Sequence, residues 1–99
     1  MNIDNIITKK IKDNIDPFYF RLINFSEQHS HHATNNRGEY SHIRLIIASD
    51  IFDSKSKVNR ERLIHKLLTE ELKDHVHALV LKLYSINEFK LLSTQDLEE

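Results

Sequence analysis

The chain has 99 residues, a length that fits one domain, and its 14 basic and 15 acidic residues give a formal net charge of −1. It therefore lacks the strongly basic balance that is typical of general nucleic-acid binders. The absence of cysteine excludes disulfides, thiolate ligands of its own and a cysteine nucleophile, whereas seven histidines are many for this length. With no apolar run near the ~20 residues that span a bilayer and no secretory signal, we expect a cytoplasmic protein that does not bind membranes.

The first half of the chain predicts a helix, a strand, a long loop and a second strand. Isoleucines recur at helical spacing over about residues 3–13, before a proline that prevents the helix from continuing. Residues 18–25 alternate as an aromatic and β-branched strand, and residues 42–49 alternate again. The polar loop 26–40 between them carries three histidines and the single glycine, and loops of this length are often functional.

The second half predicts a helix, a strand and a short final helix. A polar connection over 50–59 leads to a leucine-rich helical stripe at 60–73. Residues 76–84 form an apolar strand, in which His77 is predicted to share a face with Leu79, Leu81 and Leu83. Asn87 is the expected cap of a short helix that ends at Leu92.

The predicted order is therefore α-β-β-α-β-α. A hairpin followed by a right-handed β–helix–β crossover gives an α/β (α+β) domain, with a three-stranded mixed sheet covered by helices. We expect this single domain to occupy residues 1–92, followed by a polar tail at 93–99.

His77 is the first candidate for a functional residue. It lies near the start of an apolar strand, where an unpaired imidazole costs free energy. A role as a metal ligand or contact residue would explain a histidine at this position. A histidine whose ring hydrogen-bonds to the backbone or to solvent would explain it as well.

The loop histidines form the second candidate. His29, His31 and His32 lie in a segment long enough to bring a neutral imidazole to a metal ion. A solvated polar loop is the simpler interpretation, and a site for zinc, nickel or copper formed by these histidines alone is a further one.

A basic run that leads into the second helix is the third candidate. Lys57, Arg60, Arg62 and Lys66 are suited to phosphate contacts near a helix start, although a solvated helix face explains them equally. None of the common enzyme signatures is present, so we expect no catalytic activity.

Three segments together resemble the BolA family. They are Gly38-Glu39-Tyr40-Ser41-His42-Ile43-Arg44-Leu45 with the following Ser49-Asp50-x-Phe52, then Asn59–Ile64 continuing to Leu68-Thr69-Glu70-Glu71-Leu72, and finally Val76–Leu81 ending in Tyr84–Phe89. The resemblance covers about residues 3–91. It implies a fold similar to the class II KH type and partnership with monothiol glutaredoxins. A homodimer of the apo form is left open by the sequence.

The resemblance also implies an iron–sulfur site. The family's signature histidine corresponds to His77, which with a loop histidine can ligate a [2Fe–2S] cluster whose other two ligands are a glutaredoxin cysteine and a glutathione thiol. His29 is the positional match in the loop. Because this loop is longer than is usual in the family, His31 or His32 could replace His29, and His42 is expected to have a supporting or surface role.

DNA-binding transcriptional regulation is the alternative function that the resemblance implies. Lys57, Arg60, Arg62 and Lys66 would then contact phosphates. The family's Arg-His-Arg is Arg60-Glu61-Arg62 here, which makes this site less basic, and a glycine that is common before the helix is Ser54.

Overall fold

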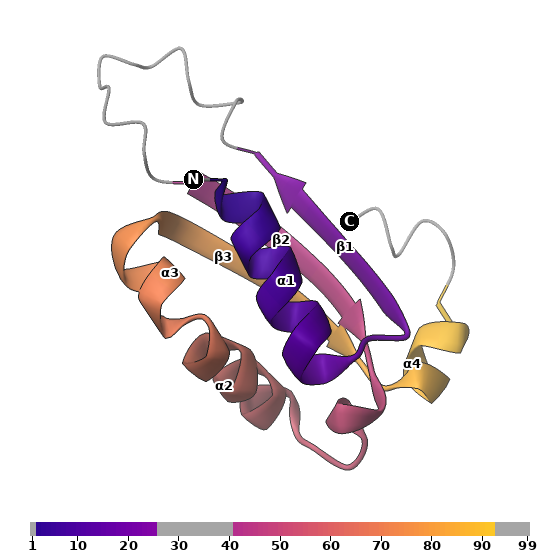
Figure 1. Cartoon of the computed structure of the whole chain (residues 1–99). Helices are drawn as coiled ribbons and strands as arrows, with labels where there is room; N and C mark the ends of the chain where they lie inside the picture. The colour runs from indigo at the N-terminus through magenta and orange to yellow at the C-terminus, as the bar shows by residue number, and fades with distance from the viewer. Residues whose placement is uncertain (1, 26–40, 93–99) are drawn as a thin grey trace.

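In the computed structural model, which describes residues 2–25 and 41–92, the elements are α1 (Ile3–Ile15), β1 (Tyr19–Asn24), β2 (Ser41–Ala48), the 3-10 turn η2 (Asp50–Phe52), α2 (Lys57–Leu67), α3 (Thr69–Asp74), β3 (Val76–Tyr84) and α4 (Ile86–Lys90) (Figure 1). The predicted order is confirmed, except that the second helix is divided in two. Among the described residues, no helix has the length and apolar character needed to cross a membrane.

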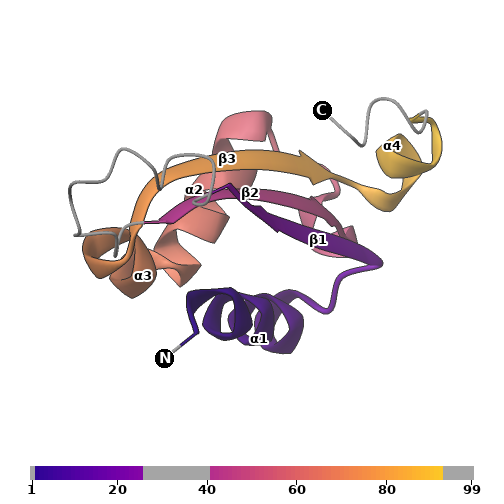
Figure 2. The same cartoon turned by 90° about the horizontal axis from the view of Figure 1, so that it is seen from above.

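The three strands form one mixed sheet in the order β1-β2-β3. β1 and β2 pair antiparallel, and β2 and β3 pair parallel, as the hairpin and the crossover predicted. α1 lies across one side of this sheet, and α3 and α4 lie at opposite ends of β3 (Figure 2). The α/β fold class with a three-stranded mixed sheet and helices is therefore confirmed.

The core fills the space between the sheet and its helices. Ile7, Ile11 and Ile15 form the buried stripe of α1, which extends this helix two residues beyond the predicted end. They belong to one apolar cluster whose other buried members are Ile43, Leu45, Ile47, Phe52, Ile64, Leu68 and Val76. Burying each such side chain contributes about 1.5–3 kcal/mol, so this cluster accounts for the position of α1 on the sheet.

The predicted helix 60–73 is wrong in its start and in its continuity. The Ser56 hydroxyl accepts a bond from the Asn59 N–H, so α2 begins at Lys57. The apolar stripe could not reveal this first turn because its one apolar residue, Val58, is exposed. At Leu68 the backbone leaves helical geometry, and the Thr69 hydroxyl donates to carbonyls of the preceding turn, a contact that bends helices.

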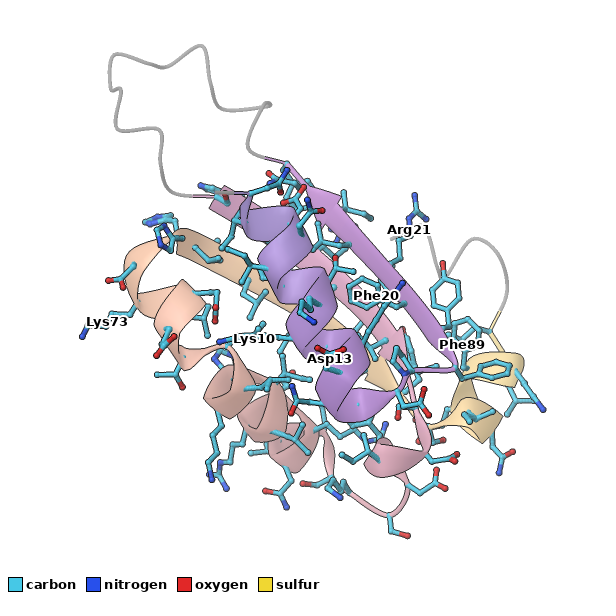
Figure 3. All side chains as sticks on the ribbon, viewed as in Figure 1. Lys10, Asp13, Phe20, Arg21, Lys73 and Phe89 are labelled. Carbon is cyan, nitrogen blue, oxygen red and sulfur yellow. The ribbon has the colours of Figure 1, made fainter. Side chains whose placement is uncertain are left out.

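The cap of the last helix also differs from the prediction. Ser85, not Asn87, is the N-cap: its hydroxyl accepts from the Glu88 N–H, while the Glu88 carboxylate accepts from the Ser85 N–H. α4 ends at Lys90. Its Phe89 side chain is labelled on α4 in Figure 3. The centre of this ring lies 4.6 Å from that of Tyr19, so the short helix is anchored on the start of β1.

Candidate functional site

His77 is an exposed residue at the beginning of β3. Ser41 is opposite Val76 and His42 is opposite Ala78, so the register between β2 and β3 shifts at this point. Val76, not His77, therefore joins the core, and the predicted shared face of His77 with Leu79 and its alternate neighbours is wrong. An irregularity of this kind redirects a side chain and is common beside functional sites.

The ring of His77 lies beside that of His42 on the neighbouring strand. The two ring centres are 5.2 Å apart, with 38° between the planes. His42 is half-buried and His77 is exposed, so the pair is open to solvent on one side. Sequence periodicity alone did not reveal this contact, because the register shift places the two histidines together.

The histidine-bearing segment 26–40 is attached at the same end of the sheet. The Phe25 N–H donates to the His42 carbonyl and the Ser41 N–H donates to the His75 carbonyl, each at 2.8 Å. The chain therefore leaves and re-enters the sheet next to the two rings. His29, His31 and His32 lie outside the described residues. Within 2–25 and 41–92, no group of three or more side chains could hold a metal ion.

Arg60 has a structural environment that sequence reasoning missed. Its side chain is only 11% exposed. Its guanidinium donates two hydrogen bonds to the Glu88 carboxylate, from Nη1 to Oε1 at 2.6 Å and from Nη2 to Oε2 at 3.2 Å. It also donates to the carbonyls of Lys55 and Leu83. The hydrogen bonds from Arg60 and from the Ser85 N–H lower the pKa of Glu88 from 4.5 to about 2.

The other basic candidates, Lys57, Arg62 and Lys66, are exposed on α2. Lys57 borders a hollow of about 400 Å³ between the start of α2, β3 and α4, where Lys82 and Tyr84 are also found. Lys66 borders another, of about 380 Å³, between α2 and the end of α1. Arg62 lies near Asn59, at 3.4 Å from its side-chain oxygen. Arg60 lines the same hollow as Lys57, with its guanidinium bound by Glu88.

The fold and this site define a small mixed α+β domain with two imidazoles at one end of its sheet. A family model described as "BolA-like protein" matches residues 11–88, most of the chain. The chain belongs to the BolA family.

Relatives from several organisms support this assignment. The DNA-binding transcriptional regulator BolA of Haemophilus influenzae is 40% identical over 91% of this chain and 84% of its own length, and that of Escherichia coli is 33% identical over 91% and 82%. SufE-like protein 1 of Arabidopsis thaliana, chloroplastic/mitochondrial, is 41% identical over 74% of this chain but only 21% of its own length.

Solved structures of BolA domains have the same fold. The BolA domain of SufE1 from Arabidopsis thaliana superposes with a TM-score of 0.76 at 35% identity, over 89% of this chain and 96% of that one. BolA1 from the same plant gives a TM-score of 0.79 at 28% identity, again over 89% and 96%.

Proposed function

We propose that this chain is a non-catalytic partner of a monothiol glutaredoxin and shares a [2Fe–2S] cluster with it, in iron–sulfur assembly, trafficking or iron regulation. The observation that carries the proposal is the position of His77, exposed at the start of β3 and beside a second imidazole. His29 is the expected co-ligand, because its segment is attached at this end of the sheet.

The donor set fits a shared site better than one complete in this chain. His77 and its expected co-ligand His29 would supply two imidazoles, and the chain has no thiolate to complete four ligands. As the resemblance to the BolA family implies, both thiolates would come from the glutaredoxin cysteine and from glutathione. Replacing two thiolates by imidazoles raises the reduction potential of such a cluster relative to all-cysteine ligation. In such a complex, His77 and His29 would themselves be the two imidazole ligands.

Cluster reconstitution tests the proposal. The full chain is mixed with a monothiol glutaredoxin, iron, sulfide and glutathione, and visible absorption and circular dichroism are recorded. We expect a heterocomplex spectrum that differs from that of the glutaredoxin alone and that is lost in His77→Ala. His65→Ala, which removes an exposed histidine on α2, is the matched control and should leave the spectrum unchanged. An unchanged spectrum in His77→Ala would show that the ligand assignment is wrong.

A second candidate function, DNA-binding transcriptional regulation, is favoured by the names of three bacterial relatives. Lys57, Arg62 and Lys66 are exposed and could contact phosphates, whereas the Arg60 guanidinium is already bound by Glu88. Duplex DNA is titrated at two salt concentrations, because phosphate contacts make affinity fall steeply with salt. Binding at low salt that weakens when Lys57, Arg62 and Lys66 are changed to Gln supports this function, and no binding at low salt excludes it.

A further inference from the structure

The hollow of about 400 Å³ between the start of α2, the end of β3 and α4 has apolar walls. Leu81 and Leu83 of β3 supply part of them, and Leu92, which follows α4, supplies another part. Leu92 is also the last residue that the structure describes. The segment 93–99 therefore begins at the wall of the hollow.

The charges that line this hollow are unequal. Arg60 contributes a cation, but the Glu88 carboxylate balances it. Lys57 and Lys82 remain, and neither forms an ion pair with another of the described residues. In the described lining, Glu61 is the one acid that opposes them. An anionic group at this place would thus be attracted by two lysines on different walls, one on α2 and one on β3.

The segment that follows Leu92 has the complementary composition. Residues 93–99 read Ser-Thr-Gln-Asp-Leu-Glu-Glu, with three acidic residues, no basic one and a single leucine. Asp96 and Glu98 flank Leu97, which places an apolar side chain between two carboxylates. Seven extended residues reach at most roughly 23–25 Å, which is ample for a segment that starts at the hollow itself.

We propose that the acidic segment 93–99 docks in this hollow of its own chain, with carboxylates at Lys57 and Lys82 and with Leu97 on the leucines of the wall. Each exposed ion pair strengthens such a contact only by a factor of about 1.5–5. Weak contacts suffice, however, because a tethered segment is present at an effective concentration of about millimolar. Docking covers Lys57, so the segment also competes with polyanions for this lysine.

Nuclear magnetic resonance of the full chain at low salt tests the docking. The methyl protons of Leu97 should show Overhauser effects to those of Leu81 or Leu83. The backbone amides of 94–98 should have order parameters above about 0.6, below which a backbone is flexible. An unaltered chain that shows no Overhauser effect from Leu97 to the hollow would overturn the proposal.

A charge variant tests the role of the two lysines. In Lys57→Gln/Lys82→Gln, the Overhauser effects should weaken by at least about twofold, because two exposed ion pairs are removed. Lys66→Gln/Lys73→Gln is the matched control, since it removes two exposed lysines of α2 and α3 that do not line the hollow. Equal effects of the two double variants would show that the lysines of the hollow do not hold the segment.

A sample that mixes differently labelled chains distinguishes the segment of one chain from that of a second copy. Overhauser effects within one chain support the proposal. Effects that appear only between chains would place the segment in the hollow of another copy and would overturn docking within the chain.

Competition with a polyanion gives an independent test, with heparin as the probe at low salt. Removing the carboxylates by Asp96→Asn/Glu98→Gln/Glu99→Gln should strengthen heparin binding by at least about twofold. This gain should be smaller when Lys57 and Lys82 are already changed to Gln, because the two sets of charges are coupled. The same gain in both backgrounds would contradict docking at the lysines. Neither measurement involves a glutaredoxin or a cluster, so its outcome is independent of the proposed function.

Discussion

The guanidinium of Arg60 and the carboxylate of Glu88 meet in a two-point contact that ties α2 to α4, with 2.6 Å between Nη1 and Oε1. Because Arg60 also donates to the Leu83 carbonyl, one side chain connects α2 to β3 as well. Arg60 was predicted to bind the phosphate of a nucleic acid, but in the structure its guanidinium binds the carboxylate of Glu88 in the same chain. A two-point charged contact is among the stronger hydrogen-bond arrangements in proteins.

Glu88→Gln should destabilise the domain at neutral pH, by about 1 kcal/mol. The effect is modest because the Glu88 side chain is 50% exposed and solvent screens the pair. Folding lowers the pKa of Glu88 from 4.5 to about 2, so this contribution to stability is fully present above pH 4.5 and is lost as the pH falls toward 2. Denaturant unfolding at several pH values measures the difference between wild type and variant.

The matched control for this prediction is Glu70→Gln, because the Glu70 side chain is 86% exposed and lies 4.0 Å from Lys10. Its stability difference from wild type should be close to zero at every pH. A Glu88→Gln difference that is the same at pH 7 and pH 2.5 would contradict the assigned role of the Glu88 charge.

Ser85→Ala should cost about 1 kcal/mol, whereas Asn87→Ala should have little effect. Ser85 is buried and forms both halves of the capping box, while Asn87 lies exposed inside α4. Thermal unfolding of both variants distinguishes the two candidate caps. Equal losses, or a larger loss in Asn87→Ala, would support the cap that the sequence predicted and contradict the one in the structure.

The order of elements was predictable because each carries its own apolar period, as the isoleucines of α1 and the alternating β2 residues do. The division of α2 from α3 was not predictable in this way. The leucines continue through Leu68, and only the local bonds of the Thr69 hydroxyl bend the chain there. The start of α2 was missed because a single serine, Ser56, and not an apolar stripe, determines it.

His77 could be singled out from the sequence because a polar residue interrupts an apolar strand. The contact of His77 with His42 could not be predicted, because it depends on a one-residue shift in register between β2 and β3. The sequence of neither strand indicates this shift. Arg60 illustrates the opposite error. Its basic neighbours suggested an exposed patch, whereas Glu88, 28 positions later, binds its guanidinium.

Lys10→Met should destabilise the domain by about 2 kcal/mol, because it leaves the buried Glu71 carboxylate without its cation. The Lys10 Nζ lies 2.9 Å from Glu71 Oε2, and the Glu71 side chain is only 8% exposed. Figure 3 shows Lys10 on the side of α1 that faces α3. Adding Glu71→Gln to the lysine variant should restore part of the loss, since the buried charge is then removed.

The matched control for this pair lies one residue away. Lys9 is also 2.9 Å from a carboxylate, that of Asp13, but these side chains are 78% and 58% exposed. Lys9→Met should therefore change the unfolding free energy by less than about 0.5 kcal/mol. Similar losses in the two lysine variants would mean that burial of Glu71 does not determine the strength of its ion pair.

Ser54→Gly should stabilise the domain by about 0.5 kcal/mol, although it removes a side chain. Ser54 has φ 64°, a left-handed conformation that costs a residue with a Cβ about 1–2 kcal/mol. Glycine avoids this cost, but it also increases the entropy of the unfolded chain, which offsets part of the gain in stability. Ser56→Gly is the matched control, because Ser56 has φ −68° and caps α2, so the same exchange should lose a few tenths of a kcal/mol. Denaturant unfolding of both variants measures whether each exchange raises or lowers the free energy of unfolding. A loss in Ser54→Gly as large as that in Ser56→Gly would show that the left-handed backbone at Ser54 imposes no strain.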